Sequence, residues 1–244
     1  MDSATGDLQQ AYRKVCLMKL NIGNLLRCAT ALAVLSAAPS AMAATIAMWT
    51  FETSQPVTAG PHAAEVGTGS ASGLHAGAAT YSTPAGNGSP RSFSSNVWAI
   101  GDYYQFTSSS ASLSDIVISW DETRSGTGPA NFEVQYTTDG STYQAIPALL
   151  VPAYTVPAVT WNGTTPDGTG TSSFSRDLST ITGLNNNSTI GFRLVATSAP
   201  TSTGGTNRVD NFKIATVEVP EPASAALLGM LGLALVAASR RSAR

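Results

Sequence analysis

Short runs in which apolar and polar residues alternate dominate residues 44–218 of the chain. The two-residue period is clearest over Ile116–Trp120, Phe132–Tyr136 and Ile190–Ala196. This period is typical of β-strands that are buried on one face, and no stretch of the region keeps a helical period. Further candidate strands are Thr45–Glu52, Asp102–Thr107, Thr142–Ile146, Val156–Trp161, Ser172–Leu178 and Arg208–Val217. We therefore expect an all-β domain of about nine strands.

A turn signal joins two of these runs. Asp139-Gly140 lies between Asn131–Thr138 and Ser141–Ile146, and Asp-Gly between alternating runs is typical of a β-hairpin. The stretch Phe-Glu-Val-Gln-Tyr-Thr-Thr-Asp-Gly-Ser-Thr-Tyr resembles the hairpins of discoidin-like and galactose-binding-like jelly rolls. The resemblance implies a jelly-roll-like antiparallel β-sandwich, in which the first and last strands usually pair. An immunoglobulin or fibronectin-type sandwich is the alternative.

The core of such a sandwich would contain most of the large apolar residues of the alternating runs. We expect these buried residues to be Trp49, Phe51, Trp120, Phe132, Tyr136, Phe192, Phe212 and Ile214. Residues 57–90 differ, because they are rich in Gly, Ala, Ser and Thr, and we expect long loops there with one or two irregular strands. His62 and His75 fall in this stretch and are interpreted as loop histidines without an acidic partner.

The amino-terminal region has the features of a secretory signal peptide. Lys19 and Arg27 precede an apolar stretch, Ala29–Ala38, and the small-x-small motif Ala41-Met42-Ala43 follows. We expect residues 1–43 to be removed by cleavage between Ala43 and Ala44. Met18 is the more natural start of translation, so we expect residues 1–17 to come from a start codon assigned too far upstream. Both cysteines, at 16 and 28, lie in this leader, so we expect no disulfide in the exported domain.

The carboxyl-terminal residues 219–244 have three parts. Pro220 and Pro222 disfavour a helix around Glu221, and the uncharged residues 223–239 then favour one. At about 1.5 Å per residue this segment reaches roughly 25 Å, close to the hydrocarbon core of a bilayer. Arginines at 240, 241 and 244 follow. The order predicts a transmembrane helix with its basic end in the cytoplasm; a buried C-terminal helix is the alternative.

This tail resembles the PEP-CTERM sorting signal of exported proteins in Gram-negative bacteria that make extracellular polysaccharide. The resemblance covers about a tenth of the chain. It implies a precursor held in the inner membrane, recognised by an exosortase, cut near Pro-Glu-Pro and passed to the cell surface or the extracellular matrix. The sorting residues would be Val219, Pro220, Glu221, Pro222, Ala223, Ser224, Arg240 and Arg241.

Charge and motifs argue against two classes of function. Residues 44–219 contain 12 Asp or Glu and 6 Lys or Arg, whereas nucleic-acid binding needs clustered cations. No nucleophile or metalloprotease motif occurs, and Asp121 and Glu122 are neighbours that a strand would point to opposite faces. They therefore make a poor acid/base pair for glycoside cleavage. We expect a protein that is not an enzyme.

One metal site is expected from resemblance. Glu52 ends the first strand and Asp210 lies in the last, and several carbohydrate-binding jelly rolls join such residues around a structural calcium. Calcium takes 6–8 oxygen ligands, which two carboxylates and nearby carbonyls could supply. The alternative is that Asp210, on the same face as Phe212, accepts hydrogen bonds from loop amides.

Two functions of the domain remain open. The first is a structural or adhesive matrix protein linked to exopolysaccharide or biofilm. The second is a carbohydrate-binding module, in which exposed aromatic rings would stack on sugars. A secreted hydrolase is the least favoured. The candidate aromatic residues for sugar binding are Trp98, Tyr103, Tyr104, Tyr154 and Trp161.

Overall fold

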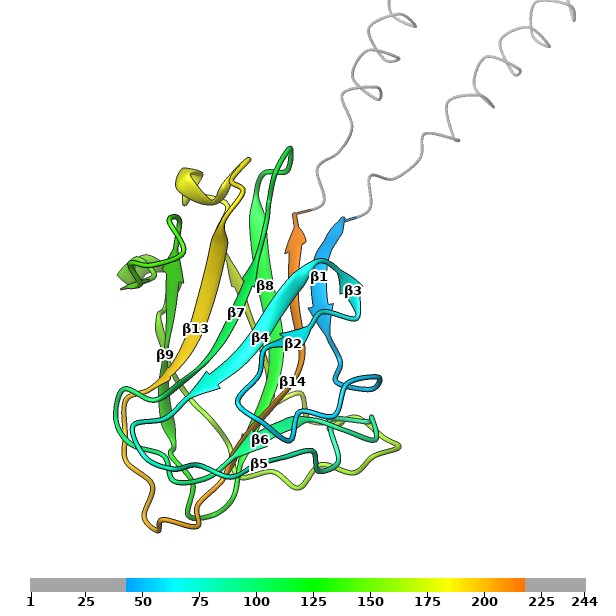
Figure 1. Ribbon diagram of the computed structural model, residues 1–244, viewed down its shortest axis with the longest axis vertical. Helices are drawn as coiled ribbons and strands as arrows, with labels where there is room; N and C mark the ends of the chain where they lie inside the picture. Colours follow the sequence, from blue (N-terminus) through cyan, green and yellow to red (C-terminus); the bar gives the residue numbers. More distant parts are fainter. Residues whose placement is uncertain (1–42, 218–244) are drawn as a thin grey trace, which may run out of the picture. The chain divides into compact units, whose positions relative to one another are not determined.

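The computed structural model describes residues 43–217, which form fourteen strands and two single-turn 3₁₀ helices, η2 (Ala148–Leu150) and η3 (Thr182–Leu184). Every strand pairing is antiparallel, and the strands form two seven-stranded sheets (Figure 1). The all-β, jelly-roll-like sandwich expected from the sequence is confirmed. The strands exceed the expected nine because several contain only two or three residues.

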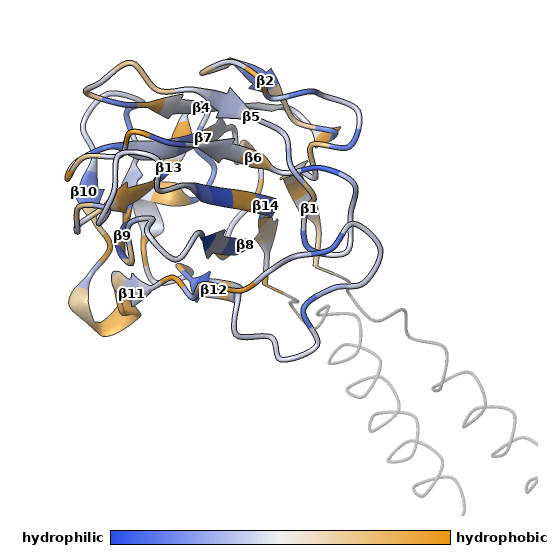
Figure 2. Cartoon of the chain, turned by 90° about the horizontal axis from the view of Figure 1, so that it is seen from below, coloured by the Kyte–Doolittle hydropathy of each residue, from blue (hydrophilic) through white to orange (hydrophobic). Residues whose placement is uncertain are grey.

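Sheet A has the order β12-β8-β14-β1-β3, and β5 and β6 join it through β14. Its strands are β1 (Thr45–Trp49), β3 (Val66–Gly67), β5 (Tyr81–Ser82), β6 (Phe93–Ser95), β8 (Ile116–Arg124), β12 (Ser173–Asp177) and β14 (Asn207–Thr216). Sheet B has the order β10-β9-β13-β7-β4-β2, and β11 also pairs with β9. Its strands are β2 (His62–Ala63), β4 (Gly69–Leu74), β7 (Tyr103–Ser108), β9 (Asn131–Thr137), β10 (Gln144–Ala145), β11 (Ala153–Thr155) and β13 (Ile190–Ala196). Figure 2 shows the two layers from below.

Aromatic side chains fill the space between the sheets. Phe106 of β7 and Phe212 of β14 stack with ring centroids 3.6 Å apart, and Trp49 of β1 meets both rings edge-on. Each ring buries a large apolar area, and edge-to-face pairs add a further attraction. The expected core residues are buried, except that Tyr136 is only partly buried.

The first and last strands of the sandwich are direct neighbours, as expected. Thr45 of β1 lies opposite Ala215 of β14, and the Thr216 N–H donates to the carbonyl of Ala44. The start of β1 and the end of β14 therefore lie side by side (Figure 1).

Residues 57–90, expected to form long loops with one or two irregular strands, contain the four strands β2 to β5, and β4 is six residues long. Its inward positions are Ala71, Gly69 and Gly73. A Cβ on Gly69 would lie 2.7 Å from the Trp49 ring, and one on Gly73 would lie 2.8 Å from Tyr81. Large aromatic side chains thus occupy the space of the strand's own side chains, which hides its apolar period.

Two other expected elements differ. The loop between β9 and β10 covers residues 138–143 instead of two residues, because the Asp139 side chain accepts the N–H groups of Ser141 and Thr142 and closes a wider turn. The expected strand at Val156–Trp161 is absent, and β11 ends at Thr155. Val156 and Trp161 are nevertheless buried, so the alternation there reflects an irregular segment packed on the core.

The expected signal peptide and transmembrane helix lie outside the described residues, as do the sorting residues from Val219 onward and Ala41. Residues 43–217 contain no helix that is long and apolar enough to cross a membrane.

Candidate functional site

The outer face of sheet B carries a row of polar side chains across four strands. Ser72 of β4 lies opposite Gln105 of β7, Gln105 opposite Arg193 of β13, and Arg193 opposite Gln135 of β9. These residues alternate with buried ones such as Phe106 and Phe192, so the row points away from the core. Hydrogen-bonding groups thus follow one line across the sheet.

Arg193 is held between two tyrosines at the centre of this row. The Arg193 Cζ atom lies 3.9 Å from the ring centroid of Tyr103 and 3.5 Å from that of Tyr143. Its Nε donates to the Gln105 Oε1 at 2.9 Å. Stacking of a guanidinium on an aromatic face is favourable, and the Gln105 bond fixes one edge of the plane. The guanidinium therefore has a defined orientation.

Tyr143 reaches this position because of the long β9–β10 loop and a glycine beneath it. Hydrogen bonds from the loop hold the pKa of Asp139 well below its usual range, chiefly the one from the Thr142 N–H, so Asp139 is ionised at neutral pH. A Cβ on Gly191 would lie 2.6 Å from the Tyr143 hydroxyl oxygen, so a larger residue would have to displace the hydroxyl end of the ring. The hydroxyl is buried without an aligned hydrogen bond, and burial raises the pKa of Tyr143, a rise that the adjacent Arg193 guanidinium opposes.

A hollow of about 470 Å³ adjoins this group. It is lined by Tyr103, Gln105, Arg193, Ser70, Ser72 and the exposed Leu74, among others. A concave surface with a few polar groups and an aromatic wall is the usual form of a small-molecule site. We refer to Ser72, Tyr103, Gln105, Gln135, Tyr143 and Arg193 as the Arg193 face.

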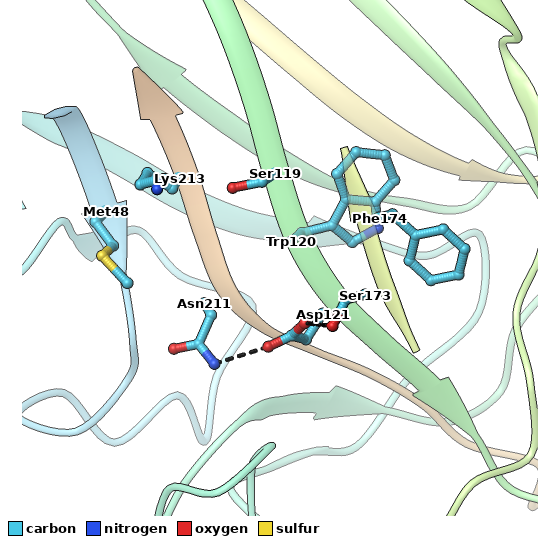
Figure 3. A pocket seen from close by; sticks show the side chains of 8 residues that line it. All are labelled: Met48, Ser119, Trp120, Asp121, Ser173, Phe174, Asn211 and Lys213. Atoms are coloured by element: carbon cyan, nitrogen blue, oxygen red, sulfur yellow. Dashed lines mark hydrogen bonds between the residues drawn. The ribbon is translucent and has the colours of Figure 1, made fainter. Parts of the chain in front are cut away.

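The outer face of sheet A carries a second hollow, of about 340 Å³ (Figure 3). Here Asp121 accepts hydrogen bonds from the Ser173 hydroxyl at 2.6 Å and from the Asn211 amide at 2.9 Å. Lys213 and Met48 lie on the other side of the hollow. We refer to Met48, Ser119, Asp121, Ser173, Asn211 and Lys213 as the Asp121 face.

A β-bulge in β14 decides where Asp210 points. The register shifts between Asp210 and Lys213, and Asn211 has a positive φ of 51°. Asp210 therefore pairs with Asp121 on the outer side of sheet A, while Phe212 points inward. The expectation that Asp210 shares a face with Phe212 is wrong, because the extra residue reverses the alternation.

The structure brings the two expected calcium ligands to one segment, residues 86–91. Asp210 Oδ2 accepts from the Asn87 N–H and the Ser89 hydroxyl, and Glu52 accepts from the Arg91 N–H. Burial raises the pKa of Asp210 to about 7. Donor groups point at the Asp210 carboxylate where a cation would have to bind, so the arrangement does not fit calcium. Glu52 and Asp210 as calcium ligands stay a prediction.

Inside the sandwich, Glu122 is a fully buried carboxylate. It accepts hydrogen bonds from the Trp120 indole at 3.0 Å, the Tyr154 hydroxyl at 2.7 Å and the Asn207 amide at 2.9 Å. Burial raises its pKa to about 7, although these three bonds oppose the rise. Asp121, the neighbouring residue, lies on the outer face, so the two carboxylates point to opposite sides as expected.

His75 has an acidic partner that sequence reasoning missed. Its Nδ1 lies 3.1 Å from Asp102 Oδ2, and its Nε2 lies 3.0 Å from the Ser95 hydroxyl. All three side chains are buried, and Asp102 also accepts the Ala76 and Ala99 N–H groups. Burial lowers the pKa of His75. The group ties the loops around β4, β6 and β7 together beneath the surface.

Among the aromatic residues expected to bind sugar, only Tyr103 belongs to the Arg193 face. Trp98, Tyr104 and Trp161 are buried, and Tyr154 packs on the core. Arg193, Gln105, Gln135 and Tyr143 were missed. The alternation already pointed Arg193 and Gln135 outward, but only the strand order brings them together.

Solved structures that resemble the chain include xylanase modules and an adhesin domain. The CBM22-1 xylan-binding domain of Xyn10C from Paenibacillus barcinonensis is 14% identical, with 75% of this chain and 99% of that one covered and a TM-score of 0.41. The CBM22-1-GH10 modules of xylanase 10B from Clostridium thermocellum, complexed with xylohexaose, are 13% identical over 72% of this chain and 29% of that one, with a TM-score of 0.46. The K3 cleaved adhesin domain of Lys-gingipain from Porphyromonas gingivalis W83 is 11% identical over 72% and 100%, with a TM-score of 0.42. At these values the comparisons say nothing about what this chain binds.

No curated protein matches the chain. Its carboxyl-terminal residues 218–244 match the PEP-CTERM protein-sorting motif. The tail that begins with Val219-Pro220-Glu221-Pro222 is thus confirmed as the sorting signal of an exported protein.

Proposed function

We propose that the chain is a structural or adhesive protein of the extracellular matrix that attaches to exopolysaccharide through the Arg193 face. The observation that carries the proposal is the line of Ser72, Gln105, Arg193 and Gln135 beside Tyr103 and a hollow of about 470 Å³. Amide and hydroxyl groups hydrogen-bond to sugar hydroxyls, and the wall of a tyrosine ring covers apolar sugar surface.

The sorting tail supports the destination. In the proposed route the precursor is held in the inner membrane of a Gram-negative bacterium, and an exosortase cuts it near Pro220-Glu221-Pro222. Fractionation of cells with and without the exosortase tests this part. We expect uncut protein in the inner membrane of the mutant and shorter protein outside the wild-type cell. Equal distribution in the two strains would exclude the route.

The binding proposal is tested with the full chain, purified with mild detergent present throughout. Affinity electrophoresis against a panel of neutral and acidic polysaccharides should show retention by at least one of them. Tyr103→Ala and Gln105→Ala should weaken this retention by about tenfold, which corresponds to about 1.4 kcal/mol. Ser119→Ala on the opposite sheet is the matched control and should change nothing.

The second candidate is a matrix protein that binds no sugar and acts through its folded body alone. The burial of Trp98, Tyr104 and Trp161 favours it, because these rings cannot form a sugar platform. A correctly folded chain that no polysaccharide retains would select this candidate and reject glycan binding.

A further inference from the structure

Arg193 differs from the other arginines of residues 43–217 in what its terminal nitrogens contact. In each of the other four, Nη1 donates to a backbone carbonyl oxygen, at Glu52, Ser125, Ser175 and Ala85 for Arg91, Arg124, Arg176 and Arg208. Arg193 donates only through Nε, to Gln105. Within the described residues, its Nη1 and Nη2 make no aligned hydrogen bond, and the Tyr143 hydroxyl interacts with the guanidinium closely enough to oppose the rise in the pKa of Tyr143.

The positive charge of Arg193 also has no close counter-charge. Among residues 43–217 the only contact within 4.0 Å between a basic and an acidic side chain is that of His75 with Asp102. Gln105 and Gln135, the cross-strand neighbours of Arg193, are both uncharged. Glu133 lies on the same outer face, where it accepts a hydrogen bond from Gln135, and it forms no ion pair with Arg193.

The geometry of this cation suits a planar anion. Tyr103 and Tyr143 hold the guanidinium plane, and the bond to Gln105 fixes its Nε side. The Nη edge is left with a fork of donors whose spacing matches the two oxygens of a carboxylate. Because these side chains already contact one another without a ligand, we expect binding to cost little additional conformational entropy.

We propose that the Arg193 face binds acidic polysaccharides, with Arg193 pairing through both terminal nitrogens with the carboxylate of a uronic acid residue. This inference rests on the proposed function and specifies its substrate class. The ring of the same sugar would lie along Tyr103, and its hydroxyl groups would reach Gln105 and Ser72, which line the same hollow.

Diffuse electrostatic attraction cannot produce this preference. Residues 44–219 contain twice as many acidic as basic residues, so the domain as a whole repels a polyanion. Any gain from the ligand's carboxylates must come from a local cation with good geometry. Lys213 offers the same formal charge on the Asp121 face, but it has no aromatic ring stacked on it and is not part of the Arg193 face.

The experiment compares ligands that differ only in charge. Polygalacturonate and alginate are each paired with a neutral derivative of the same backbone, the methyl ester and the carboxyl-reduced polymer. Binding of the full chain is measured for wild type, Arg193→Gln, Arg193→Lys and Lys213→Gln, and thermal melting checks that each variant folds. Dextran sulfate tests whether the anion must be a carboxylate.

We expect wild type to bind at least one of the acidic polymers at least tenfold more tightly than its neutral partner. Arg193→Gln should abolish this difference. Arg193→Lys should lose most of it, because an ammonium cannot bind both carboxylate oxygens side by side. Lys213→Gln, which removes the same charge elsewhere, should retain it.

Three results would overturn the inference: equal affinity of wild type for the charged and neutral forms, an equal loss in Lys213→Gln, or dextran sulfate binding that matches the uronates and ignores Arg193. Binding of neutral polymers alone leaves the proposed function standing and rejects this inference. Binding of no polymer at all by folded protein rejects both.

Discussion

The outer faces of the two sheets carry similar charged and polar groups, which differ in how far the fold already occupies their hydrogen-bonding capacity. On the Asp121 face, the oxygens of Asp121 accept the Ser173 hydroxyl and the Asn211 amide, and Asp210 beside it is closed over by residues 86–91. On the Arg193 face, the terminal nitrogens of Arg193 make no aligned hydrogen bond within the described residues. The contrast teaches that a charged group marks a binding surface only where its hydrogen-bonding capacity is not already taken up by the fold.

The largest expected effect is a fall in stability as the pH rises. Glu122 and Asp210 both have a pKa of about 7 in the folded state, against 4.5 and 3.8 for the free side chains, because burial disfavours their charged forms. The folded state therefore holds protons that the unfolded state has released. The stabilisation that results from these two groups is complete below about pH 4 and is lost as the pH rises through about 7. It is on the order of 3 kcal/mol of unfolding free energy for each group.

Unfolding by urea between pH 4 and pH 8 measures this fall. His75 acts in the opposite sense, because its lowered pKa means that acid destabilises the fold, so variants are needed to separate the groups. Asp210→Asn should flatten the profile, whereas Arg193→Gln should leave its slope unchanged. If Arg193→Gln altered the slope of the free energy of unfolding against pH as much as Asp210→Asn does, the contrast between the two faces would not hold.

A smaller effect is expected from crowding Tyr143. In Gly191→Ala the added Cβ would lie 2.6 Å from the Tyr143 hydroxyl oxygen, and the hydroxyl end of the ring would have to shift. We expect a loss of about 1–2 kcal/mol in the free energy of unfolding, as for other overpacked sites. Gly126→Ala is the control, because no atom lies within 4 Å of the new Cβ. Equal melting curves for the two variants would contradict the described position of Tyr143.

Removing the hydroxyl groups of two tyrosines compares one that has no aligned hydrogen bond with one that donates a hydrogen bond. The Tyr143 hydroxyl is buried without an aligned hydrogen bond, whereas the Tyr154 hydroxyl donates to Glu122 at 2.7 Å. Tyr143→Phe should raise stability by about 1 kcal/mol, and Tyr154→Phe should lower it by a similar amount. Calorimetry of both variants provides the measurement. The same sign of change in both would show that the two hydroxyls are in equivalent environments.

The smallest expected effect concerns calcium. Because N–H and O–H groups already donate to Asp210, millimolar calcium should leave the melting temperature of the full chain unchanged. Calcium should likewise leave the melting temperature of Asp210→Ala unchanged, whatever the stability of that variant. A calcium-induced rise in wild type that Asp210→Ala abolishes would instead establish the site expected at Glu52 and Asp210.

The strands that the sequence predicts best are those whose period comes from their own side chains. In β8 and β13 the inward positions hold Ile116, Ile118, Phe192 and Leu194, so alternation finds them. In β4 the inward positions hold glycine and alanine because Trp49 and Tyr81, from other strands, fill the space. That compensation depends on the tertiary fold and leaves no local pattern.

The candidate site could be predicted one residue at a time but not as a group. Alternation correctly placed Gln135 and Arg193 on outer faces, yet their adjacency to Tyr103 and Gln105 depends on the order β9-β13-β7-β4, which no local pattern specifies. Conversely, one bulge at Asn211 moved Asp210 to the face opposite the expected one. A single-residue insertion in a strand therefore limits how well the sequence predicts which face of the sheet a side chain lies on.

The end of β14 at Thr216 has a consequence for how the protein is delivered. In the proposed route the tail would be cut near Pro220, and β14 is already complete at Thr216. Cleavage of the tail would therefore remove no strand from either sheet. The released molecule would keep the architecture of its precursor, so a single peptide-bond cleavage could change its location without refolding it.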